Sequence, residues 1–233
     1  MMARRNSKSV PATRVEPFQV RDCALICRTA NVHPVLNLRE LRDRLEICPD
    51  ASLYHHFCET RLRATFDDPE YPNDFAVWAA HALRDPTLAE RLGMLNPYEY
   101  NDLSLLRRAA MDIIEDHLAE SSIIPWAPAE SQFQFLQAMT IVFDTGVTIS
   151  SPEGLSDAVA RMTPGSIYFH FIEARRRLPS HRDDFSAWLL TQGKDGSRLA
   201  DQFAGIAFYY LSLREIQERV LDILGAHPEE RGT

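Results

Sequence analysis

Two histidines, each followed one helical turn later by a glutamate, are the residues best suited to chemistry. They are His56 with Glu59 and His170 with Glu173. At this spacing an imidazole and a carboxylate lie on one face of a helix and can share a ligand or a proton. If the two pairs converge in one cleft, they could bind a divalent metal or act in acid–base catalysis. Their order reverses the Glu-x-x-His motif of di-iron bundles, so no defined metal centre is predicted.

Both pairs lie in a segment that occurs twice. Ser52-Leu-Tyr-His-His-Phe-Cys-Glu-Thr-Arg-Leu-Arg63 returns as Ser166-Ile-Tyr-Phe-His-Phe-Ile-Glu-Ala-Arg-Arg-Arg177, with seven of twelve positions identical. A second motif, Asn73-Asp-Phe-Ala-Val-Trp78, returns as Asp183-Asp-Phe-Ser-Ala-Trp188. Two motifs that recur in the same order predict an internal duplication.

The repeated segment also carries tyrosines and arginines beside each imidazole. Guanidinium groups form forked hydrogen bonds with carboxylates and phosphates, so the same cleft could bind an anionic or sugar-phosphate ligand. The candidate ligand-binding residues are Tyr54, His56, Glu59, Arg61, Arg63, Tyr168, His170, Glu173, Arg175 and Arg177.

A structural interpretation competes at each of these positions. The histidines could form hydrogen bonds across the contact between the two halves. Asp74 and Asp184 precede Phe-x-x-Trp, where an aspartate can cap a helix, or they could pair with Arg61 and Arg175. Tyr54 and Tyr168 could pack their rings in the core or form the floor of a pocket. Trp78 and Trp188 are typical of core anchors.

The elements around these motifs predict a predominantly α fold. We expect two tandem homologous helical units, residues 17–119 and 133–227, packed about a pseudo-twofold axis. A proline-containing linker (120–132) joins them, with a disordered basic arm (1–16) before them and a tail (228–233) after them. Residues 18–29 and 133–145 suit a strand as well as a buried helix, which leaves room for a short strand pair.

Composition is that of an ordinary soluble protein, with 45% hydrophobic and 25% charged residues. No apolar run is long enough to span a membrane, and the N-terminus lacks the apolar stretch of a secretory signal, so a cytoplasmic location is expected. The net charge of −8 opposes binding to nucleic acid. All four cysteines lie in the first half without a Cys-x-x-Cys pair, which favours buried free thiols.

The paired motifs resemble the prokaryotic domain-of-unknown-function family 5752, over nearly the whole chain. This resemblance implies no established activity, cofactor or catalytic residue, and only a loose link to carbohydrate metabolism. The sequence therefore favours a non-catalytic, ligand- or partner-binding or regulatory protein. The alternative is a metal-assisted or acid–base hydrolase or transferase that uses a His/Glu cleft between the repeats.

Overall fold

The computed structural model describes residues 16–62, 70–120 and 128–225. It is mostly helical, with one two-stranded antiparallel sheet formed by β1 (Phe18–Thr29) and β2 (Leu136–Ile149). The predominantly α class is confirmed, and both ambiguous segments are strands. At 12 and 14 residues, these strands are much longer than the strand of five to six residues that is usual in globular proteins. Most of the predicted arm and linker and the whole of the tail lie outside the described residues.

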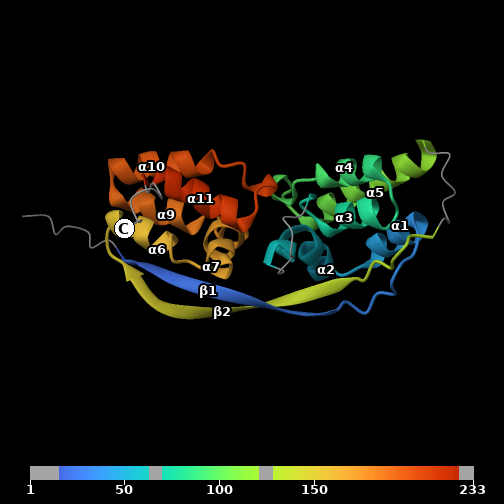
Figure 1. Cartoon of the computed structure of the whole chain (residues 1–233), viewed down its shortest axis with the longest axis horizontal. Helices are drawn as coiled ribbons and strands as arrows, with labels where there is room; N and C mark the ends of the chain where they lie inside the picture. Colours follow the sequence, from blue (N-terminus) through green and yellow to red (C-terminus); the bar gives the residue numbers. More distant parts are fainter. Residues whose placement is uncertain (1–15, 63–69, 121–127, 226–233) are drawn as a thin grey trace, which may run out of the picture.

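Two groups of helices stand side by side on the long β1–β2 ribbon (Figure 1). The first group follows β1, and the second follows β2. The first comprises α1 (Leu38–Ile47), α2 (Asp50–Tyr54), η1 (His55–Glu59), η2 (Thr60–Leu62), α3 (Asp74–His81), α4 (Pro86–Gly93), η3 (Pro97–Glu99) and α5 (Leu103–Glu120). The second comprises α6 (Glu153–Val159), α7 (Pro164–Ile167), η4 (Tyr168–Glu173), α8 (Ala174–Arg177), α9 (Asp184–Leu189), η5 (Leu190–Gln192), α10 (Lys194–Ala204), η6 (Phe208–Tyr210) and α11 (Leu213–Ile223).

Side-chain caps fix where several of these helices begin. The side chain of Asn37 accepts a hydrogen bond from the backbone N–H of Glu40 at the start of α1. Ser212 and Glu215 form a capping box at the start of α11. Such contacts satisfy backbone donors that the first helical turn leaves free.

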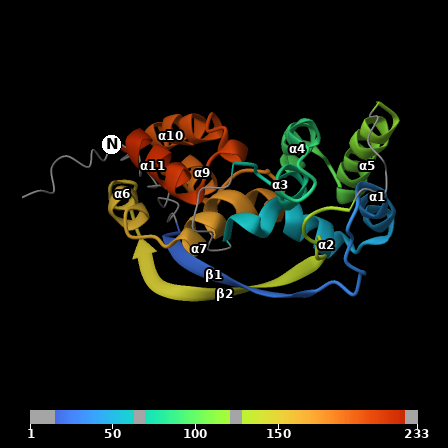
Figure 2. The same ribbon diagram turned by 45° about the vertical axis from the view of Figure 1, so that its right-hand side comes forward.

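The ribbon crosses from one helical group to the other in both directions (Figure 2). Phe18, at the start of β1, is buried in the hydrophobic cluster of the second group, whereas Ala30, just after β1, is buried in that of the first. Phe135, just before β2, lies in the first cluster, and Ile149 at the end of β2 lies in the second. The strand of the predicted unit 17–119 therefore begins in the core of the second helical group. The strand of the predicted unit 133–227 begins in the core of the first group.

All four cysteines are free thiols. Cys23, Cys48 and Cys58 are buried, but Cys27 on β1 is exposed, contrary to the expectation of burial. Burial raises the pKa of the Cys23 thiol to about 12, and the nearby carboxylate of Asp22 adds to this increase. Within the described residues, none of the helices combines the length and apolar character that crossing a membrane would require.

Candidate functional site

Each repeated motif passes from α-helix into a π-helical turn. In the first group α2 is followed by η1, which contains His56, and in the second α7 is followed by η4, which contains His170. π-Helical turns are rare in proteins and are frequent at functional sites. Both turns are almost completely buried, so their polar side chains need partners within the protein.

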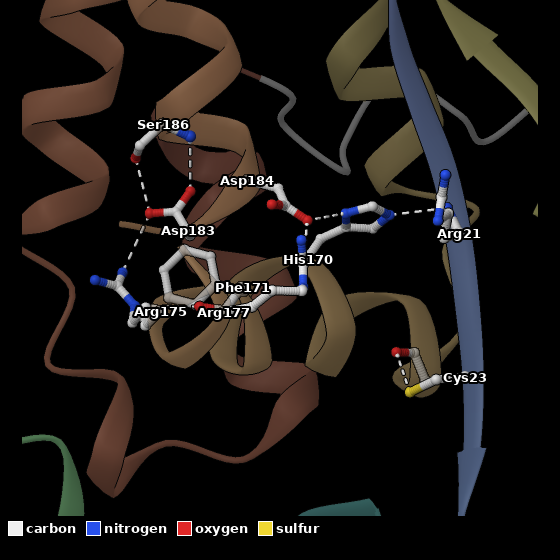
Figure 3. Close-up of polar contacts among 10 residues, drawn as sticks. Arg21, Cys23, His170, Phe171, Arg175, Arg177, Asp183, Asp184 and Ser186 are labelled. Atoms are coloured by element: carbon white, nitrogen blue, oxygen red, sulfur yellow. Dashed lines mark hydrogen bonds and ion pairs between the residues drawn. The ribbon is translucent and has the colours of Figure 1, made fainter. Parts of the chain in front are cut away.

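His170 connects a helix of the second group to the first strand (Figure 3). Its Nδ1 lies 2.8 Å from Asp184 Oδ2, and its Nε2 accepts the backbone N–H of Arg21 at 2.8 Å. The ring packs against Phe18 and Phe185, with centroids 4.9 and 5.6 Å away. Since Nε2 accepts a hydrogen bond, the proton of this imidazole lies on Nδ1 and is donated to the aspartate.

His56 makes the same set of contacts in the first group. Its Nδ1 lies 2.6 Å from Asp74 Oδ2, and its Nε2 accepts the backbone N–H of Leu136 at 2.9 Å. Its ring contacts Phe133 and Phe75. The two imidazoles thus lie in separate aromatic clusters. Each uses Nε2 to hold a strand that belongs to the opposite predicted unit, and Nδ1 to contact an aspartate of the next helix in its own group.

Asp74 and Asp184 are the first residues of α3 and α9 and do not cap these helices. The caps are the preceding residues, Asn73 and Asp183, whose side chains accept backbone N–H groups of the first turn. The capping interpretation is therefore off by one residue in both copies. This shift leaves Asp74 and Asp184 available to orient the histidines.

The two tryptophans hold the chain just before each strand. Trp78 Nε1 donates to the carbonyl of Ser131 at 2.8 Å, and Trp188 Nε1 donates to the carbonyl of Glu16 at 2.9 Å. Both indoles are also buried in the core, as expected of core anchors. Together with the histidines, they form two equivalent clamps, one on each strand.

The two predicted glutamates have different partners. Glu173 Oε2 accepts a hydrogen bond from the hydroxyl of Tyr54, which joins the two helical groups. Glu59 is bound by His55 Nδ1 at 2.9 Å and by the Thr140 hydroxyl of β2 at 3.4 Å. Neither glutamate forms a hydrogen bond with the histidine three residues before it in the described structure. The expected imidazole–carboxylate pairs are thus replaced by pairs with aspartates from the next helix.

Tyr168 is completely buried, whereas the hydroxyl of Tyr54 reaches the contact between the groups. Burial is the main reason that the pKa of both phenols is raised well above the usual value, and the charge of Glu173 contributes at Tyr168. Both hydroxyls therefore keep their protons. That of Tyr54 donates to Glu173, whereas that of Tyr168 has no hydrogen-bond partner among the described residues.

Arg61 and Arg175, on the apolar side of each motif helix, contact main-chain and aromatic groups of Phe208. Arg61 donates to the carbonyl of Phe208 at 2.7 Å, another link between the groups. Arg175 lies over the Phe208 ring at 4.5 Å and reaches Asp183 at 3.2 Å. Burial lowers the pKa of both guanidinium groups. Their partners in the described structure are therefore Phe208 and Asp183, not Asp74 and Asp184, the aspartates expected for them.

Arg177 is the arginine that meets Asp184, at 2.9 Å, while its guanidinium stacks over Phe169 at 4.4 Å. Arg63, its counterpart in the first motif, lies outside the described residues. Asp184 therefore accepts from both His170 and Arg177, which fixes its orientation toward the strand clamp.

A cavity of about 380 Å³ opens where the two helical groups meet. We call it the seam pocket. Tyr98 of η3 and Phe208 of η6 form an edge-to-face pair at the seam, with centroids 4.9 Å apart. The guanidinium of Arg176 lies 4.2 Å from the centre of the Tyr54 ring. The pocket is lined by Tyr54, Cys58, Asn96, Pro97, Tyr98, Tyr100, Asn101, Asp102, Leu103, Arg175, Arg176, His181 and Phe208.

Two further hollows lie beside the clamps. The larger, about 980 Å³, is lined by His170, Asp184, Trp188 and Arg177 among others, and the smaller, about 280 Å³, by His56, Asp74 and Trp78. In the part of the chain that is described, no cluster of three or more His, Cys, Asp or Glu side chains is arranged to hold a metal ion.

Of the predicted ligand-binding residues that the structure describes, the seam pocket brings together two, Tyr54 and Arg175. Sequence reasoning missed Arg176, because the corresponding residue of the first motif is Leu62. It also missed the aromatic turns around Tyr98 and Phe208, although an aromatic-rich stretch precedes the last helix of each half. That recurrence was a signal that could have identified them.

Comparison with known proteins agrees with this architecture. The structure is similar to that of OrfY from Thermoproteus tenax, with a TM-score of 0.72 and 24% sequence identity over 93% of this chain and 97% of that chain. At this level of identity the likeness supports the fold alone. No curated protein matches the sequence. The model of a family of unknown function, DUF5752, matches residues 15–225. Since this match spans nearly the whole sequence, the chain belongs to the DUF5752 family of unknown function.

Proposed function

We propose that this protein is a non-catalytic binding protein that holds a small anionic ligand, of the sugar-phosphate class, in the seam pocket. The observation that carries the proposal is the pocket itself, which is lined by side chains from both helical groups. A ligand there contacts both groups at once, so its binding can be transmitted through the strands that join them. This is the behaviour expected of a regulatory module.

The lining suits a phosphorylated sugar. Arg176 is 58% exposed at its side chain, yet it is positioned by stacking on Tyr54 and by a 3.4 Å contact with Glu173. An arginine held in this way can form forked hydrogen bonds with a phosphate. Asn96, Asn101 and Asp102 add amide and carboxylate groups suited to sugar hydroxyls.

The alternative, a hydrolase or transferase that uses the histidines, has less support. A general base or metal ligand needs a free ring nitrogen, whereas both nitrogens of His56 and His170 are engaged by aspartates and backbone N–H groups. These bonds favour a structural role for the imidazoles.

We also propose that the chain arose by duplication and that its halves are related by a pseudo-twofold axis. The matched clamps support this view, because His56 and His170 bind equivalent groups in the same geometry, as do Trp78 and Trp188. A cytoplasmic location and a link to carbohydrate metabolism remain part of the proposal.

The binding proposal can be tested by calorimetry with three probes: inorganic phosphate, a hexose and the corresponding hexose phosphate. We expect the hexose phosphate to bind most tightly and Arg176→Ala to weaken it by roughly 10- to 100-fold, as for a lost charge-assisted hydrogen bond. Arg214→Ala is the matched control, because Arg214 is 80% exposed and pairs only with Glu218 among the described residues. Binding that survives Arg176→Ala, or no binding by any probe at millimolar concentration, would refute the proposal.

A further inference from the structure

The outer face of the β1–β2 ribbon is apolar at its centre. Directly opposed residues of an antiparallel pair share a face. At the centre Leu25 pairs with Thr140, whose hydroxyl contacts Glu59, so this pair faces the helices. The neighbouring pairs, Ala24 with Ile141 and Ile26 with Met139, therefore face away from them.

These outward residues are largely uncovered. Ile26 is 54% exposed, Met139 63% and Ile141 43%, and Phe143 two residues further along β2 is 47% exposed. A sheet face that stays in water normally carries polar side chains that alternate with the buried ones. Here the outward positions at the ribbon centre carry large apolar side chains instead. We call the group formed by Ala24, Ile26, Met139, Ile141 and Phe143 the ribbon patch.

The position of the ribbon patch suits a second copy of the same chain. Ala24, Ile26, Met139 and Ile141 surround the central Leu25–Thr140 pair evenly on both strands. A twofold axis that lies parallel to the ribbon face, just above this pair, would bring the patch of one copy against the same patch of a second copy, as an isologous dimer requires. None of the five residues carries a charge, and Asp22, opposite Phe143 at one end of the patch, is the one charged residue paired with them, so the centre of the patch can stack despite the net charge of −8.

The exposed area is also sufficient for a modest dimer. At the fractions above, the large side chains expose on the order of 400 to 500 Å², which is within the range of the largest apolar patches on monomers. Two copies would bury roughly 1,000 Å² in all, close to the lower limit for a specific interface. Two ribbons packed face to face would form a two-layered β sandwich about 10 Å thick.

We propose that the ribbon patch is a dimer interface, through which two copies of this protein stack ribbon against ribbon. The long strands then serve two purposes, since their inner face joins the helical groups and their outer face joins two chains. The seam pockets of the dimer lie on the helical side of each chain, away from this interface.

The test is the mass of the full-length protein in solution, measured by sedimentation equilibrium. One chain has a mass of 26.6 kDa, so we expect about twice that value for the unmodified protein at micromolar concentration. Met139→Asp places a carboxylate in the patch and should raise the dissociation constant more than about 100-fold, because burial leaves this charge unpaired.

Met94→Asp is the matched control, because Met94 is 69% exposed at the end of α4, outside the ribbon. It should leave the dimer intact. Equal melting temperatures and circular dichroism spectra will show that both variants fold. The proposal would be overturned if the unmodified protein has the mass of one chain. It would also be overturned if Met139→Asp weakens the dimer no more than Met94→Asp does. Both outcomes are independent of ligand binding in the seam pocket.

Discussion

Replacing His170 with phenylalanine tests whether this imidazole is a clamp for β1. Phenylalanine keeps a ring of similar shape between Phe18 and Phe185 but removes both hydrogen bonds. The N–H of Arg21 then loses its acceptor, and Asp184 keeps its contact with Arg177, at 2.9 Å. The substitution therefore separates hydrogen bonding from packing.

The expected loss of stability follows from these two bonds. A partly buried N–H left without an acceptor costs about 1–3 kcal/mol. Asp184 retains one cationic partner, so its contribution is smaller, and the total is about 2–3 kcal/mol. For a chain of this size, that corresponds to a decrease in the melting temperature of roughly 5–10 °C. His56→Phe should have a similar effect, because its two bonds have nearly the same lengths.

Urea unfolding measures the free energy change, and amide hydrogen exchange at Arg21 reports on the clamp itself. We expect faster exchange at this amide in His170→Phe than in the unmodified protein. The control is His33→Phe, at an exposed position, which should change stability by less than about 0.5 kcal/mol. If His170→Phe is as stable as the control and its Arg21 amide stays protected, the clamp does not hold the strand.

Two further substitutions probe the packing of the strand and the capping of the last helix. In Gly165→Ala, the new Cβ would lie 2.3 Å from Asp22 Oδ1 and 2.4 Å from the Cys23 carbonyl oxygen, so we expect the free energy of unfolding in urea to fall by about 1–3 kcal/mol. Gly154→Ala is the control and should have a smaller effect, because its new Cβ would lie 3.3 Å from its nearest neighbour. Equal effects of the two substitutions would contradict this packing. The backbone N–H and the hydroxyl of Ser212 both donate to Glu215 and lower its pKa, and Ser212→Ala removes the hydroxyl's share of this effect together with the side-chain cap. A lowered carboxylate pKa stabilises the fold above the usual glutamate pKa, and this contribution is lost as the pH falls through the folded-state value. Thermal melts should therefore show a larger destabilisation by Ser212→Ala at pH 7 than at pH 3, and equal destabilisation would exclude Glu215 as its source.

The repeated motifs identified polar residues that recur, but not the partners that these residues contact. The recurrence of His56 and His170 indicated that both copies need an imidazole, and each does hold a strand. The spacing of residues along one helix suggested that each histidine pairs with the glutamate three residues later. Such spacing carries no information about side chains from a neighbouring helix. The actual partners, Asp74 and Asp184, come from the next helix and reach the imidazoles through tertiary packing.

The exchange of strands could not be read from the sequence. Local patterns identify a strand but do not specify which helices it will pack against. Residues 18–29 showed no alternation clean enough to exclude a helix, because the outward positions Ala24 and Ile26 are apolar too. These outward apolar residues made the strand hard to recognise in the sequence, and they are also part of the ribbon patch from which the dimer interface is inferred.

The exchanged strands have a mechanical consequence for the proposed ligand site. Tyr54 and Glu173 connect the two groups at the seam, and Arg61 reaches across to Phe208. Each group is also clamped to the strand that begins in the opposite predicted unit. A ligand that draws Arg176 and Tyr98 together therefore cannot move one group without pulling on a strand anchored in the other. Such coupling requires no long-range pathway of side chains, because the covalent chain itself crosses the seam twice.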